Sequence, residues 1–167
     1  MENGSSQPTA AALVHEYYQA VYRFAYRLSR SQTDAEDLTQ HTFLTACRKL
    51  DGLRDPEKAR SWLFTIVRNA YLKSRPQQDA PVVSLDDSPE PAGEWDPEVS
   101  FDGERITTAL NDLPDAFRLP LLLYYFEDLP YKEISAILNV PIGTVMSRLA
   151  RGKEYLRCSL GTPETTP

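Results

Sequence analysis

The sequence predicts an all-α protein in which two small helical domains are joined by an acidic, proline-rich linker. Apolar residues recur every three or four positions in the N-terminal and C-terminal parts, which is the period of an amphipathic helix. Between these parts, residues 76–104 hold nine acidic residues, five prolines and no lysine or arginine. Such a stretch cannot bury enough apolar surface to offset its ordering entropy. We therefore expect domains at residues 12–75 and 105–160.

The negative charge of the chain is concentrated in this linker. The whole sequence holds 18 Lys and Arg against 24 Asp and Glu. Without the nine linker acids, 15 acidic residues remain, so the two domains together are mildly basic. No run approaches the ~18 apolar residues of a membrane span, and the first residues lack the order of a secretory signal. We expect a cytoplasmic protein without membrane insertion.

The cysteines and histidines limit the chemistry that the chain can perform. Cys47 and Cys158 lie far apart, with no CxxC or Cys/His cluster, which argues against a disulfide framework or a zinc site. We expect buried or incidental thiols. His15 and His41 have no nucleophile, metal-ligand cluster or phosphate-binding loop around them. The sequence therefore predicts neither an enzyme nor a bound metal or cofactor.

The first domain is predicted to begin with two helices. VHEYYQAVYRFAYRLS has an apolar stripe at helical spacing, and a break follows at residues 30–32. Thr33 is the expected N-cap of the next helix, DAEDLTQHTFLTACRKL, with Glu36 completing a capping box. The predicted inward residues of the first helix are Val14, Tyr17, Tyr18, Val21, Phe24, Ala25 and Leu28.

A basic loop and a third helix complete the first domain. Gly52 and Pro56 interrupt helix in the loop DGLRDPEKAR. The helix SWLFTIVRNAYLKSR follows, and its basic residues lie outside its apolar stripe. Residues 12–75 hold eleven basic and seven acidic residues, which favours an acidic partner.

The second domain ends in the pattern of a helix-turn-helix. YKEISAILN predicts a short helix, and Asn139 stands at the turn, where a left-handed backbone is needed. Pro141 ends this helix, and the next is expected to begin near Gly143 or Thr144.

The second helix of this motif has a packed side and a polar, cationic side. The packed side holds Val145, Leu149, Gly152 and Leu156. The other side suits a DNA major groove, where Arg pairs with guanine or phosphate and Ser or Thr bonds either. A solvated amphipathic helix would show the same pattern. The predicted DNA-contacting residues are Thr144, Met146, Ser147, Arg148, Ala150 and Arg151.

Three motifs together are more specific than the helix-turn-helix alone. DAEDLTQHTFL, RSWLFTIVRNAYLKSR and LPDAFRLPLLLYYFEDLPYKEISAILNVPIGTVMSRLARGKEYLR resemble, in order and spacing, the extracytoplasmic-function group of sigma factors of the sigma-70 family. The resemblance implies a sigma-2-like helical bundle, which docks on RNA polymerase and opens the -10 promoter element. It also implies a sigma-4-like helix-turn-helix domain for the -35 element. The implied partners are core RNA polymerase, promoter DNA as duplex at -35 and as single strand at -10, and an anti-sigma factor.

The resemblance also implies residue roles in the first domain. The helix DAEDLTQHTFL would bind the clamp helices of the largest catalytic polymerase subunit, through Asp34, Glu36, Asp37, Gln40 and Phe43. The acids would equally suit a helix N-terminus, and Phe43 would equally suit the core. The basic loop and the third helix would hold a flipped base of the non-template strand. Their implied residues are Arg54, Lys58, Arg60, Trp62, Asn69 and Lys73, with core packing favoured over base stacking for Trp62.

The linker and the whole chain leave alternatives open. Fully extended, residues 76–104 would reach ~90 Å, which exceeds the ~70 Å of two DNA turns. By resemblance the acidic linker would occupy a polymerase channel, whereas a solubilising spacer would have the same composition. A stand-alone helix-turn-helix regulator would leave the first 75 residues unexplained. A sigma mimic that sequesters an anti-sigma factor is the other alternative.

Overall fold

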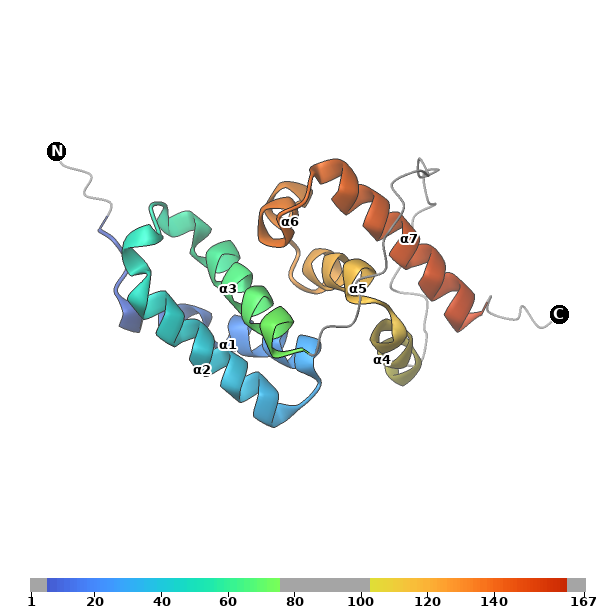
Figure 1. Ribbon diagram of the computed structural model, residues 1–167, viewed down its shortest axis with the longest axis horizontal. Helices are drawn as coiled ribbons and strands as arrows, with labels where there is room; N and C mark the ends of the chain where they lie inside the picture. The colour runs from blue at the N-terminus through green and yellow to red at the C-terminus, as the bar shows by residue number, and fades with distance from the viewer. Residues whose placement is uncertain (1–5, 76–102, 162–167) are drawn as a thin grey trace. The chain divides into compact units, whose positions relative to one another are not determined.

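The computed structural model describes residues 6–75 and 103–161, which form helices and connecting turns without a strand (Figure 1). One compact unit holds α1–α3, and a second holds α4, α5, α7 and the greater part of α6. The predicted all-α fold with two helical domains is confirmed. Most of the predicted linker, residues 76–102, lies outside the described residues. The helices are α1 (Ala10–Ser29), α2 (Gln32–Arg48), α3 (Ala59–Ser74), α4 (Gly103–Asp112), α5 (Asp115–Leu121), α6 (Tyr131–Leu138) and α7 (Ile142–Leu160).

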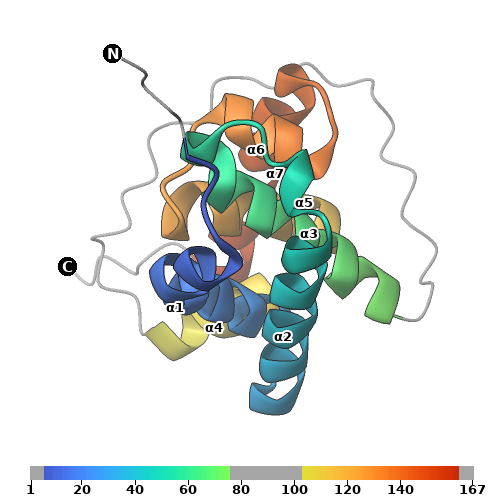
Figure 2. The same cartoon turned by 90° about the vertical axis from the view of Figure 1, so that its left-hand side faces the viewer.

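Helices α1 and α2 form a hairpin with a very short turn (Figures 1 and 2). Arg30 ends α1 in the left-handed conformation, with φ 58°. Ser31 follows in extended backbone, and its side chain accepts a hydrogen bond of 3.3 Å from the backbone N–H of Asp34. Thr33, the predicted N-cap, therefore lies inside α2. The prediction was wrong by two residues because the chain is already extended at Ser31 and enters the helix directly after it.

The core of the first unit lies between α1, α2 and α3. The rings of Phe24 and Phe64 meet there with centroids 4.8 Å apart, and both side chains are fully buried. Leu13 is buried, whereas Val14 and Tyr18, which were predicted to face inward, are 36% and 42% exposed. The first turns of α1 are thus rotated by about one residue from the predicted stripe.

Two short 3-10 turns, η1 (Leu50–Gly52) and η2 (Pro56–Lys58), connect α2 to α3. Asp55 caps the second turn, because its carboxylate accepts a 3.0 Å hydrogen bond from the backbone N–H of Glu57. The basic loop that follows α2 is therefore a folded element.

In the second unit, α4 and α5 both pack against α7. Gly152 lets α5 approach closely, because a Cβ atom at this position would lie 2.8 Å from Cδ1 of Leu121. Arg105 in the first turn of α4 donates a 2.9 Å hydrogen bond to the carbonyl of Leu160 at the end of α7. These contacts hold the C-terminal half of α7 against α4 and α5.

A π-helical turn, η3 (Leu122–Phe126), follows α5. It begins two residues after Pro120, which has no N–H to donate to the preceding turn. The wider turn places Tyr124 beside Tyr125 and Tyr131, with ring centroids 4.9 and 5.2 Å apart. The ammonium of Lys153 lies 5.7 Å from the ring centroid of Tyr125, which ties η3 to α7.

Cys47 on α2 and Cys158 on α7 are free thiols, and both are exposed. They are therefore not buried, and the other part of the expectation, that they are incidental thiols, stays a prediction. Within residues 6–75 and 103–161, no three His, Cys, Asp or Glu side chains gather in a way that could hold a metal ion. No helix of these two ranges is both long and apolar enough to cross a membrane.

Candidate nucleic-acid interface

The turn between α6 and α7 is closed by its own side chains. Asn139 takes the predicted left-handed conformation, with φ 54°, and its N–H donates to the carbonyl of Ser135. The N–H of Val140 donates to the same carbonyl at 3.2 Å. The hydroxyl of Ser135 in turn donates to the carbonyl of Val140 at 2.5 Å. This reciprocal pair of bonds fixes the angle at which α7 leaves the turn (Figure 1).

Helix α7 begins one residue earlier than predicted. Pro141 is its N-cap residue, and the carbonyl of Pro141 accepts hydrogen bonds from Thr144 and Val145 at 3.0 and 3.1 Å. Ile142 is therefore the first helical residue, ahead of Gly143. Pro141 itself lies outside the helix, with φ −59° and ψ 151°.

The two sides of α7 divide as the sequence predicts. Val145, Leu149, Gly152 and Leu156 are buried, which confirms the packed side. Of the predicted DNA-contacting residues, Met146 is 50% exposed. The others have intermediate exposure: Thr144, Ser147, Arg148, Ala150 and Arg151. Partial burial lowers the pKa of Arg148 from its ordinary value, although an arginine stays cationic at neutral pH.

Ile142 is a surface residue of this helix that the sequence prediction missed. Its side chain is 45% exposed and lies one helical turn before Met146. It was left out because the helix was predicted to begin after it. The signal that could have identified Ile142 is its i, i+4 spacing from Met146, another large apolar residue on the polar side of the helix.

The basic loop of the first unit is anchored by one apolar side chain. Leu53 is 3% exposed and packs in a cluster with Leu13 and Ala59. Arg54 and Lys58, one and five residues after this anchor, are exposed. The loop therefore presents two predicted strand-contacting cations on a fixed backbone.

The remaining residues of the predicted -10 set follow along α3. Trp62 is partly buried and packs against the Leu53 cluster, as favoured from the sequence. The guanidinium of Arg60 lies 5.2 Å from the ring centroid of Phe64, while Asn69 and Lys73 are exposed. The structure thus leaves Arg60, Asn69 and Lys73 accessible along one helix.

The predicted polymerase-binding residues of α2 divide into two kinds. Four polar members are exposed: Asp34, Glu36, Asp37 and Gln40. Phe43 is 8% exposed and stacks on Tyr18, with centroids 6.2 Å apart and planes inclined by 13°. Tyr22 stacks on Tyr18 and Tyr26 on Tyr22, each at 6.4 Å. Phe43 therefore supports an aromatic row on α1, and its contact with a partner stays a prediction.

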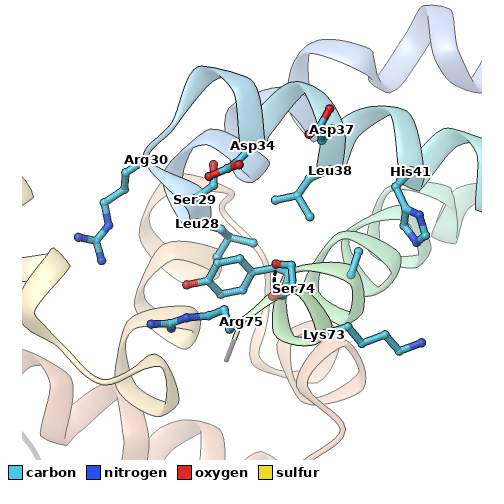
Figure 3. Close-up of a pocket in the computed structure, with 12 residues that line it drawn as sticks. Leu28, Ser29, Arg30, Asp34, Asp37, Leu38, His41, Lys73, Ser74 and Arg75 are labelled. Atoms are coloured by element: carbon cyan, nitrogen blue, oxygen red, sulfur yellow. Dashed lines mark hydrogen bonds between the residues drawn. The ribbon is translucent and has the colours of Figure 1, made fainter. Parts of the chain in front are cut away.

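A hollow of about 760 Å³ lies where the α1–α2 corner meets the end of α3 (Figure 3). Asp34, Asp37 and His41 line it from α2, and Lys73 and Arg75 line it from the end of α3. Residues of the predicted polymerase-binding set and of the predicted -10 set thus border one surface feature. The sequence did not indicate this, because the members that line the hollow, such as Asp37 and Lys73, are more than thirty residues apart.

Two family models match the sequences of the two units. Residues 13–80 match the model described as Sigma-70 region 2, and residues 103–156 match the model described as Sigma-70, region 4. The first range covers most of α1 with all of α2 and α3, and the second covers α4–α6 with most of α7. Both units of the structure are thus matched, in chain order.

Curated relatives match across most of the chain. SigE of Mycolicibacterium smegmatis, an ECF RNA polymerase sigma factor, is 37% identical over 160 residues. The match covers 92% of this chain and 62% of SigE, so the chain spans less than two thirds of that relative. SigW of Bacillus subtilis, also an ECF RNA polymerase sigma factor, is 31% identical over 171 residues, covering 92% of this chain and 90% of SigW.

Solved structures show the same fold. The sigma factor RpoE in complex with the anti-sigma factor NepR, from Bartonella quintana, matches with a TM-score of 0.68 and 29% identity. That match covers 90% of this chain and 96% of RpoE. CnrH in complex with the cytosolic domain of CnrY matches with a TM-score of 0.64 at 24% identity, a likeness of fold.

Proposed function

Because the chain belongs to the extracytoplasmic-function sigma factors of the sigma-70 family, we propose that it directs core RNA polymerase to specific promoters. It then nucleates opening of the DNA strands at the -10 element. One observation carries this proposal: regions 2 and 4 occur in order in one chain, each folded as its own unit. The polymerase supplies the catalysis, so the chain itself is not an enzyme and acts in the cytoplasm, where polymerase is.

Helix α7 recognises the -35 element in duplex DNA. Its polar side carries Arg148 and Arg151 beside Ser147, which can bond guanine edges and phosphates in a major groove. The closed turn at Asn139 supports this role, because it holds the recognition helix at a fixed angle to α6.

The basic loop and α3 hold the opened -10 strand. Exposed cations at Arg54, Lys58 and Lys73 can follow phosphates, and single-stranded bases gain roughly 1–3 kcal/mol each from stacking. The chain has no phosphate-binding loop for ATP, so the free energy of strand opening comes from binding. Leu53 supports this role because it fixes the loop backbone before DNA arrives.

The exposed face of α2 docks on core polymerase. Asp34, Glu36, Asp37 and Gln40 give it a mainly acidic character that complements a basic partner surface. An anti-sigma factor is the proposed second partner of the chain. This inference follows from RpoE of Bartonella quintana, whose structure was solved as a complex with the anti-sigma factor NepR.

Reconstituted transcription tests the proposal. The purified chain is added to core polymerase and a library of genomic promoter fragments, and transcript start sites are mapped. We expect initiation from a defined set of promoters sharing -35 and -10 elements. A sigma mimic or a stand-alone regulator would give no promoter-specific transcripts, and that result would contradict the proposal.

Arg151→Ala separates DNA recognition from polymerase binding in the same assay. It should lower initiation from promoters with a -35 element about tenfold, because one well-placed Arg–base contact contributes ~1–3 kcal/mol. Polymerase affinity should not change. Arg157→Ala, on the exposed C-terminal half of α7, is the matched control. Equal loss of polymerase binding in Arg151→Ala would mean that α7 has a structural role only.

A further inference from the structure

Two large apolar side chains lie exposed on the recognition helix. Ile142 and Met146 are 45% and 50% exposed, one helical turn apart in the first two turns of α7. Residues at this spacing share one side of a helix. The other large apolar residues of these turns, Val145 and Leu149, are 0% and 2% exposed. The exposed pair is therefore not needed for the core of the second unit.

The position of the pair indicates what covers it when the helix is bound. N-terminal residues of the second helix of a helix-turn-helix contact base edges in the major groove. Arg148 and Arg151 follow within the next turns and attract a polyanion. The major groove displays one prominent apolar group, the C5-methyl of thymine. Duplex DNA thus offers both the negative charge that suits the arginines and an apolar group that suits the pair.

We propose that Ile142 and Met146 recognise thymine methyl groups in the -35 element. This inference rests on the proposed function and adds to it a class of base. The two residues are separated by about 6 Å along the helix axis, close to two base-pair steps of ~3.4 Å. The element then carries thymines two base pairs apart, on either strand, under the first two turns of α7.

The two side chains differ in how they meet a methyl group. Ile142 is branched at Cβ and has few rotamers, so it contacts a methyl group at one fixed position. Met146 has an unbranched, flexible side chain, so it can follow a methyl group that shifts by a fraction of a base pair. We therefore expect stricter thymine selection at the Ile142 position than at the Met146 position.

Replacement of thymine by deoxyuridine tests the proposal, since deoxyuridine pairs as thymine does and lacks only the methyl group. Reconstituted holoenzyme first selects -35 sequences from a randomised duplex library. The best element is then synthesised with each thymine replaced in turn, and binding is measured. We expect about fourfold weaker binding at two positions, equivalent to the ~0.8 kcal/mol gained by burying one CH2-sized group.

Variants assign each position to a residue. Ile142→Ala should abolish the deoxyuridine effect at one position, and Met146→Ala should abolish it at the other. Met146→Leu keeps an apolar contact and should retain the effect. Because both native side chains are about half exposed, their truncation should leave helix content unchanged by circular dichroism.

Two results would overturn this inference while leaving the proposed function intact. In the first, a -35 element is selected but no position responds to deoxyuridine. In the second, both alanine variants retain the full response. If holoenzyme selects no sequence at all, the proposed function fails and the thymine inference fails with it.

Discussion

Asn139 determines how the two helices of the DNA-binding motif are joined. Its left-handed backbone brings the N–H groups of residues 139 and 140 onto the carbonyl of Ser135, and the Ser135 hydroxyl closes the turn from the other side. A residue with a Cβ atom and no local hydrogen-bonding side chain is disfavoured in this conformation. The single residue therefore controls the orientation of α7.

Asn139→Ala should lower the free energy of unfolding of the second unit by about 1 kcal/mol, because alanine adopts the left-handed conformation less readily than asparagine. Asn139→Gly is the matched control and should be at least as stable as the native protein. Urea unfolding followed by circular dichroism measures both. Equal losses in the two variants would show that the asparagine side chain, and not the backbone conformation, stabilises the turn.

At the scale of elements, α5 and α7 approach each other closely at Gly152. Cβ of any other residue would come within 2.8 Å of the buried side chain of Leu121 and 3.4 Å from the carbonyl oxygen of Phe117. Because α5 precedes the π-helical turn, a displacement of α5 would also move the aromatic residues Tyr124 and Tyr125.

Gly152→Val should lower the free energy of unfolding by about 2 kcal/mol, because overpacking a well-filled helix contact typically costs ~1–3 kcal/mol. Gly143 on the same helix has no atom within 4 Å of a built Cβ, so Gly143→Val is the control. Thermal unfolding should show a lower midpoint for the first variant and little change for the second. If both variants behave alike, the close approach of α5 does not limit residue size at position 152.

The sequence predicted the elements better than their ends. Helical periodicity placed the packed side of α7 correctly, because aliphatic residues dominate it. On α1 the prediction failed at Val14 and Tyr18, where the helix is rotated by about one residue from the predicted stripe. Tyrosine in particular suits both a core and a surface. Here Tyr18 stacks with neighbouring rings at the surface. The start of α2 was missed because Ser31 and Thr33 are both residues that can cap a helix. The start of α7 was missed by one residue.

The candidate site was predictable where it lies on one continuous segment. The helix-turn-helix and the basic loop both met this condition, since local turn residues and charges define them. The hollow lined by Asp37 and Lys73 could not be predicted, because it depends on how α2 and α3 cross. Exposure of Ile142 also needed the structure, which alone fixed the first residue of α7.

At the scale of the whole molecule, each unit holds a tyrosine whose pKa is raised above its ordinary value of 10.0. Burial is the main cause for Tyr17, with a hydrogen bond and charge from Glu16 adding to it. Burial is also the main cause for Tyr131, followed by the charge and hydrogen bond of Tyr124. Both units therefore favour protonated phenols in the folded state.

We expect both units to lose stability in alkaline solution. In the unfolded chain these tyrosines ionise near pH 10, whereas in the folded chain they ionise at higher pH. Their contribution is thus fully present below pH 10 and is lost as the pH rises through the folded pKa values. Unfolding free energies at pH 9 and above pH 10 measure this. A Tyr17→Phe, Tyr131→Phe double variant should lose less stability; an equal loss would assign the effect to other groups.

The exposed thiols of Cys47 and Cys158 provide two sites at which dyes can be attached to measure a distance. They are the two cysteines of the sequence, and α2 of one unit carries the first while α7 of the other carries the second. A donor and an acceptor dye can therefore be attached without any substitution. Energy transfer between them would follow the separation of the two units from the free chain to the polymerase-bound and promoter-bound states.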